Sequence, residues 1–167
     1  EVVLRYETAV ASGDVFYTDS NGRETVKRVR DERGPSYPSP YKISEPVAGN
    51  YYPVNALASI SDDCVEFDVI VDTSLGGASL ASGSLEFMVH RRLQEDDNRG
   101  VQEPLNETMC GCNDIRAAPG MMGAHGREGD GGCLCAGLTV RGRHLLVFDE
   151  VQRARALRRR LMEEVQQ

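Results

Sequence analysis

Short runs in which apolar and polar residues alternate constrain this chain more than any other feature. Residues 65–71 place every second side chain on one face of an extended strand, and these side chains are Val65, Phe67, Val69 and Val71. Leu85, Phe87 and Val89 repeat the pattern. A period of two is typical of a β-strand with one buried face, because successive side chains of a strand lie on opposite faces. These runs predict a protein built mainly from β-strands.

Turn signals indicate how the strands are connected. Asn21 and Gly22 lie between the strand-like residues 15–18 and 25–31, and an Asn-Gly pair accepts the positive φ angles of a hairpin turn. A second hairpin is predicted for residues 54–71, with a single strand over residues 54–60. Strands and turns without intervening helices through residue 100 favour an antiparallel β-sandwich.

Two segments depart from the strand pattern. Residues 103–138 are rich in glycine and cysteine, lack periodicity, and are predicted to be an irregular insertion. Residues 150–165 have helical spacing, and their predicted packed side chains are Val151, Ala154, Leu157, Leu161 and Val165. The arginines on the other face of this C-terminal helix are expected in solvent, and Asp149 is expected to cap its start. The fold predicted for residues 1–167 is mainly β, an antiparallel sandwich with a Cys/Gly-rich insertion and a short terminal helix.

Charge and hydropathy exclude some partners. A formal net charge of −7 argues against a dedicated nucleic-acid-binding domain, which would be basic. No run approaches the ~18 consecutive apolar residues of a membrane span, so no membrane partner is expected. The chain begins inside a strand-like segment without Met or a signal peptide, which is typical of a piece of a longer protein.

Four sequence blocks carry a resemblance to a known family: GDVFYTDSNGRE (13–24), EPVAGNYYPVN (45–55), LGGASLASGSLEFMVHRRLQEDDNRG (75–100) and RGRHLLVFD (141–149). In this order they resemble the C-terminal β-sandwich region of family 38 glycoside hydrolases, most closely the lysosomal-type, class II α-mannosidases. The resemblance covers residues 1–100 and 139–167.

The resemblance implies a fragment of a retaining, zinc-dependent α-mannosidase that hydrolyses terminal α-mannose from glycans. Such enzymes use an Asp nucleophile and a second carboxylic acid, with zinc held by two His and two Asp. Those groups belong to an N-terminal barrel, which is followed by a helical domain. A barrel of this kind takes about 250 residues, and its motifs are missing from this sequence. The resemblance therefore implies no catalytic residue and no zinc ligand here, an inactive isolated chain, and a location in the lysosome or secretory pathway.

The segment DDNRG is the part that the resemblance places at the edge of the sugar-binding pocket. Arg99 is the first candidate for contact with mannoside, because a guanidinium offers five donors in a fixed fork. Asp97 is the second candidate, as a carboxylate that holds this fork. A purely structural role for Arg99 is equally open, and it is favoured for Arg91 and Arg92, of which at most one can face the barrel.

The insertion carries two C-x-C pairs, formed by Cys110, Cys112, Cys133 and Cys135. In an oxidising secretory compartment these residues favour two disulfides. A four-cysteine zinc site, with His125 as a further candidate ligand, stays open. Asn106 begins the sequon Asn-Glu-Thr and is a candidate glycosylation site. Cys64, which opens a strand, is predicted to be a core residue.

An alternative function is a non-catalytic β-sandwich module that binds carbohydrate or protein. Tyr51 or Tyr52 could then stack on a sugar, although one core tyrosine and one interface tyrosine are favoured. His90 is expected to be a core or interface residue. If the chain is part of a larger enzyme, sandwich faces that meet the other domains are expected to be apolar and exposed.

Overall fold

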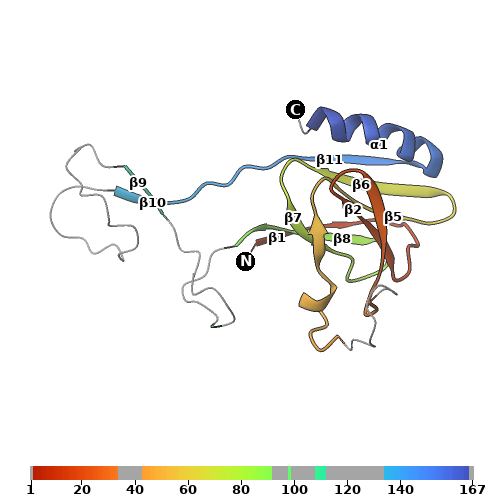
Figure 1. Ribbon diagram of the computed structural model, residues 1–167, viewed down its shortest axis with the longest axis horizontal. Helices are drawn as coiled ribbons and strands as arrows, with labels where there is room; N and C mark the ends of the chain where they lie inside the picture. Colours follow the sequence, from red (N-terminus) through yellow and green to blue (C-terminus); the bar gives the residue numbers. More distant parts are fainter. Residues whose placement is uncertain (1, 34–42, 92–97, 99–107, 112–133, 166–167) are drawn as a thin grey trace. The chain divides into compact units, whose positions relative to one another are not determined.

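A computed structural model of the chain describes residues 2–33, 43–91, 98, 108–111 and 134–165. The described residues fall into two compact units (Figure 1). The sandwich unit comprises residues within 2–89 and 142–167, and the insertion unit comprises residues within 90–141.

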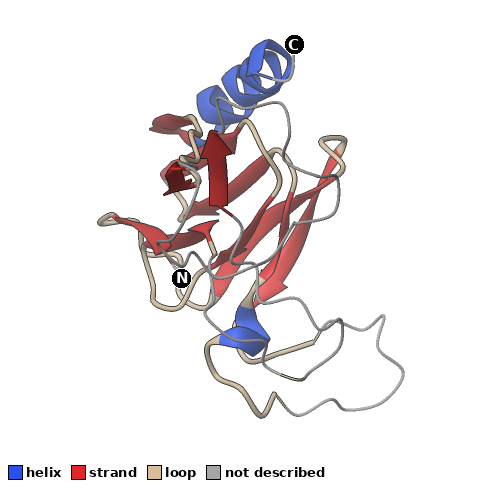
Figure 2. Ribbon diagram, turned by 90° about the vertical axis from the view of Figure 1, so that its left-hand side faces the viewer, coloured by secondary structure: helices blue, strands red, loops and turns tan. Residues whose placement is uncertain are grey.

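The sandwich unit contains two β-sheets and one helix. The four-stranded sheet has the order β1 (Val2–Glu7), β8 (Ser84–His90), β7 (Leu75–Ala78) and β4 (Tyr52–Val54). The five-stranded sheet has the order β11 (His144–Glu150), β6 (Val65–Val71), β5 (Leu57–Ser61), β2 (Val15–Ser20) and β3 (Glu24–Val29). The registers pair β4 with β7, β7 with β8, and each neighbouring pair of the larger sheet in antiparallel fashion. This confirms the predicted mainly-β sandwich (Figure 2).

The principal core lies between the two sheets. Its buried side chains come from both, and they are Val10, Phe16, Tyr52, Val54, Ala58, Ile60, Phe67, Val69, Val71, Leu85 and Phe87. Val65 and Val89 are partly buried and pack against this core. The alternation in residues 65–71 and 85–89 therefore identified the inner faces of β6 and β8 correctly.

The predicted single strand over residues 54–60 is wrong. The chain leaves the smaller sheet at Val54 and enters the larger sheet at Leu57. The carboxylate of Asp19 holds this crossing, since Oδ1 accepts the backbone N–H groups of Asn55, Ala56 and Leu57 at 2.9, 2.8 and 3.0 Å. An apolar run with strand propensity is thus split between two sheets by a side chain 35 residues and more away in sequence.

Strand β7 lies in the Gly/Ser-rich stretch between the alternating runs of β6 and β8. Its residue Gly77 pairs with Phe87 of β8 and Tyr52 of β4. A Cβ atom added to Gly77 would lie 2.6 Å from Val54 Cγ2, which is too close for two carbon atoms. Glycine is needed here for close packing rather than for a turn.

Helix α1 (Val151–Val165) covers the outer face of the larger sheet (Figure 2). Leu57, Ile70, Val147 and Ala154 form its buried contact with the sheet, joined by Leu145, Leu161, Met162 and Val165. Leu157, a predicted packing residue, is 38% exposed. Arg158 lies one helical turn after Ala154 and is only 18% exposed, so it occupies the packed face instead.

Two further expectations differ from the structure. Asp149 lies within β11 and its Oδ1 accepts the N–H of Glu150, whereas the first residue of the helix, Val151, donates its N–H to Cys64 O. Asp149 is therefore outside the cap position. Cys64 is exposed rather than in the core, because it lies in the turn closed by Asp62, whose Oδ1 accepts the Cys64 N–H.

The insertion unit contains a short hairpin that the sequence did not predict. Strands β9 (Thr108–Gly111) and β10 (Leu134–Gly137) pair antiparallel. With four residues each, one of them a glycine, they lack the alternation by which longer strands are recognised. Across the described residues, none of the helices is both long and apolar enough to cross a membrane.

Candidate functional site

The loop that follows β8 was the predicted site, and most of it lies outside the described residues. Arg99 and Asp97, together with Asn106, His125, Cys112 and Cys133, belong to the segments that are not described. Arg91 is described and exposed, and Asn98 has a φ of 57°. The roles assigned to Arg99 and Asp97 therefore stay predictions.

The strand that leads into this loop is anchored by a buried carboxylate. Glu86 of β8 is 4% exposed. Its Oε2 accepts a hydrogen bond from Arg5 Nε at 2.7 Å, and its Oε1 accepts one from the Tyr51 hydroxyl. Hydrogen bonds from a guanidinium and a hydroxyl satisfy the acceptor oxygens of a buried carboxylate. The network joins β1, β8 and the segment before β4, and it fixes the strand from which Arg91 extends.

The two tyrosines of the predicted NYYP block take different roles. Tyr52 is buried in the inter-sheet core, and the guanidinium carbon of Arg28 lies 4.4 Å from the centre of its ring. Tyr51 is half-buried and donates to Glu86. Both have protein partners, which favours the structural interpretation over stacking on a sugar.

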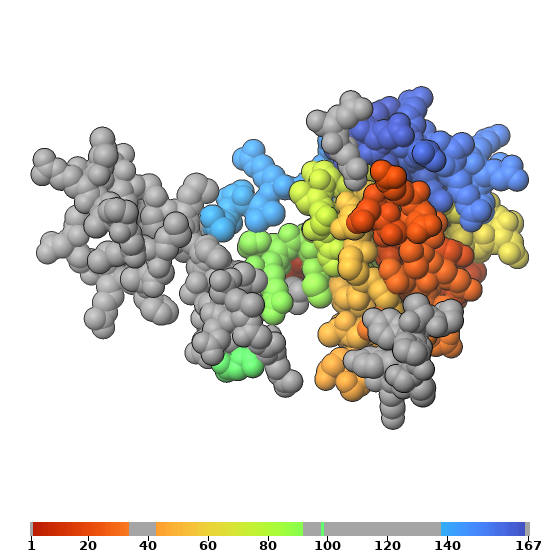
Figure 3. Space-filling view, viewed as in Figure 1, coloured from red at the N-terminus to blue at the C-terminus, as the bar shows by residue number. Residues whose placement is uncertain are grey.

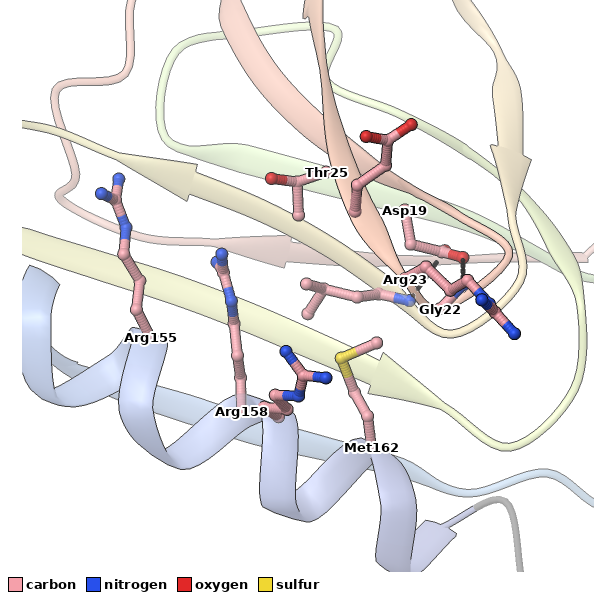
Figure 4. Close-up of a pocket in the computed structure, with 10 residues that line it drawn as sticks. Asp19, Gly22, Arg23, Thr25, Arg155, Arg158 and Met162 are labelled. Carbon is pink, nitrogen blue, oxygen red and sulfur yellow. Dashed lines mark hydrogen bonds between the residues drawn. The ribbon is translucent and has the colours of Figure 1, made fainter.

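One open pocket of the sandwich unit is lined by several arginines. It has a volume of about 390 Å³ and lies between α1 and the turn of the β2–β3 hairpin, which are neighbours on one face (Figure 3). Its lining residues are Asp19, Gly22, Arg23, Glu24, Thr25, Leu57, Arg155, Arg158, Arg159 and Met162. We call it the arginine pocket. Figure 4 shows Arg155 and Arg158 extending from α1 toward the sheet, with Arg23 at the hairpin turn.

The hairpin side of the arginine pocket is rigid. Asn21 and Gly22 both have positive φ, 52° and 69°, as predicted for this turn. Asp19 Oδ2 accepts a hydrogen bond from the N–H of Gly22 at 2.7 Å. Its Oδ1 accepts hydrogen bonds from the three N–H groups at the crossing between the sheets. The Asp19 carboxylate is thereby fully used by the backbone and is not available to a ligand.

Beneath α1, two acidic side chains of β6 face the helix. Glu66 is 1% exposed. Its carboxylate accepts hydrogen bonds from Arg155 Nε, at 2.9 Å, and from Arg158 Nη1. Asp68 is fully buried, neither of its carboxylate oxygens has a hydrogen-bond partner, and Arg158 Nη1 lies 3.6 Å from Oδ1. Burial, followed by the negative charge of Glu66, raises the pKa of Asp68 to about 7, although Arg158 opposes this rise.

Glycosidases use two carboxyl groups, a protonated one as the acid and an ionised one as the nucleophile. Glu66 and Asp68 do not fit that role, because both are closed off from solvent under α1 and a sugar cannot reach them. They form the ion cluster that docks the helix. What the arginine pocket offers to a ligand is the outward guanidinium groups of Arg23 and Arg159.

A second polar contact joins the edges of the two sheets. The Tyr6 hydroxyl lies 2.9 Å from His144 Nδ1, and the His144 ring packs against Phe87 with 5.3 Å between ring centres. Burial raises the pKa of Tyr6 and lowers that of His144, with Asp72 acting against the latter shift. The two residues are 138 positions apart in sequence, so strand periodicity could not predict their contact.

Apolar side chains are exposed on two of the edge strands, β11 and β1. On β11, Leu146 and Phe148 are 52% and 59% exposed. They pair in register with Val69 and Phe67, whose side chains are in the inter-sheet core. On β1, Val2, Val3 and Leu4 are also exposed. Isolated apolar residues on a surface are ordinary, but a row along an unpaired strand edge is a surface that proteins normally cover.

No zinc site is found in the part of the chain that the structure describes. Within it, no group of three or more His, Cys, Asp or Glu side chains is arranged to hold a metal ion. The described residues therefore do not fit the zinc that the resemblance implies for the complete enzyme.

The fold defines a β-sandwich region, and comparisons with known proteins name the family to which it belongs. The family model described as "Glycosyl hydrolases family 38 C-terminal domain" matches residues 1–99. The chain belongs to glycoside hydrolase family 38, of which it represents the C-terminal region.

Curated relatives agree with this assignment. The lysosomal alpha-mannosidase of Bos taurus is 45% identical over 99% of this chain and 14% of its own length. The lysosomal alpha-mannosidase of Homo sapiens is 43% identical over 98% of the chain and 13% of its length. A probable alpha-mannosidase of Arabidopsis thaliana is 39% identical over 99% of the chain and 14% of its length. The chain thus spans about one seventh of the length of these relatives.

Proposed function

We propose that this chain is the C-terminal sandwich part of a retaining α-mannosidase that removes terminal α-mannose from glycans. The observation that carries the proposal is the 45% identity over nearly the whole chain to a protein named as a lysosomal alpha-mannosidase. In the proposal, the nucleophile, the acid and the zinc ligands come from an N-terminal barrel, and this chain supplies structural support.

The buried acids of the sandwich unit support this division of roles. Glu66, Asp68 and Glu86 are each enclosed and committed to contacts within the sandwich, and Asp19 is saturated by backbone donors. A glycosidase needs two carboxyl groups that flank a sugar. None of these four side chains can do so.

The exposed apolar residues of β1 and β11 supply the expected docking surfaces. Leu146 and Phe148 are more than half exposed although they lie in line with core residues of β6. We infer that the barrel and helical domains of the same polypeptide cover them. The mannose-containing glycan then contacts this chain only at the loop after β8.

Within that loop, we propose that Arg99 donates hydrogen bonds at the edge of the sugar pocket and that Asp97 orients it. The proposal rests on the DDNRG resemblance and on the donor geometry of arginine. The buried contacts of Glu86 support it, because they hold the strand that precedes the loop.

The names of the same relatives support a proposal for the compartment. Two of the three relatives described above are named as lysosomal. We propose a lysosomal or secretory location, with Asn106 as a glycosylated residue of its sequon. Removal of N-glycans by a glycosidase specific for them should lower the mass of the secreted chain, and Asn106→Gln should abolish that shift.

The experiment for the main proposal compares the 167-residue chain alone with a chimera. In the chimera, the chain replaces the matching 14% of the Bos taurus relative. We expect no hydrolysis of an aryl α-mannoside by the chain alone, with zinc present, at acidic and neutral pH. The chimera should hydrolyse it and lose activity to a zinc chelator, whereas the relative truncated before this region should be inactive. Turnover by the chain alone would contradict the proposal.

A further inference from the structure

The register of the short hairpin in the insertion unit brings two distant cysteines opposite each other. Strands β9 and β10 pair antiparallel, and Cys110 is the direct partner of Cys135. The neighbouring rungs are Gly111 with Leu134 and Met109 with Ala136. The two cysteines are 25 residues apart in sequence and share one rung of the ladder.

This rung has the spacing that a disulfide requires. Directly opposed residues of an antiparallel pair have Cα atoms about 4.5 or 5.5 Å apart, depending on the rung. Disulfide-linked residues have Cα atoms about 4.4–6.8 Å apart. The Cα separations of both kinds of rung fall within this range, and the closer, non-hydrogen-bonded rung brings the Cβ atoms to about 4.5 Å, the upper end of the Cβ separation in disulfides.

The register brings no other cysteines of the two C-x-C motifs together within the described residues. Cys112 and Cys133 lie outside the described residues, so Cys110 with Cys135 is the cysteine pair that the described ladder supports.

We propose that Cys110 and Cys135 form a cross-strand disulfide that closes the β9–β10 hairpin. The hairpin has two strands of four residues, a size that is marginal in water without further support. A covalent link across it removes much of the conformational freedom of the segment between the strands in the unfolded chain. The bond thus stabilises an element whose own ladder is short.

The oxidation is balanced by a disulfide oxidant such as glutathione disulfide. The thiolate of one cysteine attacks a sulfur of the oxidant and releases one glutathione as its thiol. The second cysteine then attacks the mixed disulfide and releases the other. Two protein thiols lose two electrons and two protons, and two glutathione thiols are formed. The oxidising compartment for this step rests on the proposed function, but the pairing itself does not.

Two matched variants test the pairing, each with the exposed Cys64 also changed to Ser. Cys112→Ser with Cys133→Ser leaves Cys110 and Cys135, which share a rung. Cys112→Ser with Cys135→Ser leaves Cys110 with Cys133, a cysteine other than its rung partner. Each chain is equilibrated in glutathione buffers, and its free thiols are then alkylated. Mass spectrometry of the intact chain measures the fraction that carries the disulfide. We expect the in-register pair to have an equilibrium constant for disulfide formation at least about tenfold larger, because a strained or open geometry disfavours the bond.

The unchanged chain supplies a second measurement that does not depend on the folding of variants. Trypsin should release residues 100–116 and 128–141 as one linked pair, and fragmentation of that pair should join Cys110 to Cys135. Equal constants for the two variants, or a bond within either C-x-C motif, would overturn the proposal. So would stoichiometric zinc on the purified chain with four thiols that react only after chelation. None of these outcomes bears on the mannosidase assay of the chimera.

Discussion

One arginine of α1, Arg158, is paired within the helix–sheet interface instead of lying in solvent as the sequence predicted. It lies on the packed side of α1 with Ala154 and Leu161, and it reaches Glu66 and Asp68 of β6. The charges of the sheet and the helix are therefore paired in the interface rather than spread in solvent. The cost of burying these acids is offset by the arginine that meets them.

Replacing Arg158 with Met should destabilise the sandwich unit by roughly 3–5 kcal/mol, because the replacement leaves Glu66 and Asp68 buried without a cation on that side. Adding Glu66→Gln and Asp68→Asn should recover much of the loss. Arg160→Met is the control, since Arg160 is exposed and contacts only Glu164 at 3.1 Å, an interaction worth about 0.5 kcal/mol or less. Urea unfolding of the four proteins measures the differences. Equal effects at positions 158 and 160 would contradict the role of Arg158.

Asp68 should make the sandwich unit more stable in acid. Its folded pKa of about 7 exceeds the ordinary value of 3.8, so the folded state holds the proton more tightly. The stability from this group is fully present below pH 3.8 and is lost as the pH rises through about 7. Between pH 7.5 and pH 5, the parent protein should gain roughly 2 kcal/mol of unfolding free energy from Asp68. Asp68→Asn resembles the protonated form at every pH and should lack this gain.

The comparison of the parent with Asp68→Asn isolates this effect from others. His144 acts in the opposite direction, because its folded pKa is lowered and its contribution is lost as the pH falls. Melting curves at several pH values should therefore differ between the two proteins most at neutral pH and converge in acid. Parallel curves would show that Asp68 does not titrate in this range.

At the scale of elements, close backbone approach decides where glycine is needed. Gly83 precedes β8 and has a φ of +78°, and its N–H donates to Ser12 Oγ at 3.0 Å. Its carbonyl oxygen accepts from Thr8 N and Thr8 Oγ1, which ties the end of β1 to the start of β8. A Cβ atom at this position would lie 2.5 Å from Thr8 O and 2.9 Å from Val10 O.

Gly83→Ala should therefore cost clearly more than the ~1–2 kcal/mol of a positive φ alone. Gly13→Ala is the matched control, because Gly13 also has a positive φ, +60°, but no atom lies within 4 Å of an added Cβ. The difference between the two variants in unfolding free energy measures the steric contact. Similar losses in both would mean that the segment near Thr8 moves aside.

Much of the sandwich could be predicted from the sequence because its strands follow simple rules. The alternation in β6 and β8 and the Asn-Gly turn depend on neighbours in sequence. The sheet crossing after Val54 could not be predicted in this way, because it depends on the distant carboxylate of Asp19. The burial of Glu66 under α1 also needs the tertiary structure, since an acidic residue on a strand normally indicates solvent.

For the candidate site, the position of the loop after β8 came from resemblance rather than from periodicity. Arg99 and Asp97 lie outside the described residues, and their roles depend on domains that lie beyond this chain in its relatives. The proposed function is therefore a property of the whole molecule rather than of this chain alone. Under the proposed function, this sandwich contributes to catalysis only when it is joined to the barrel of the complete enzyme.

The most direct test of this account is the kinetics of Arg99→Ala in the chimeric α-mannosidase, with Arg91→Ala as the control. Loss of a charged donor at a sugar pocket should lower kcat/KM at least about tenfold, which corresponds to about 1.4 kcal/mol. The melting temperature should stay within a degree or two, and Arg91→Ala should leave kcat/KM nearly unchanged. A large fall in melting temperature with unaffected kinetics for Arg99→Ala would contradict the account, because Arg99 would then support the fold rather than the substrate.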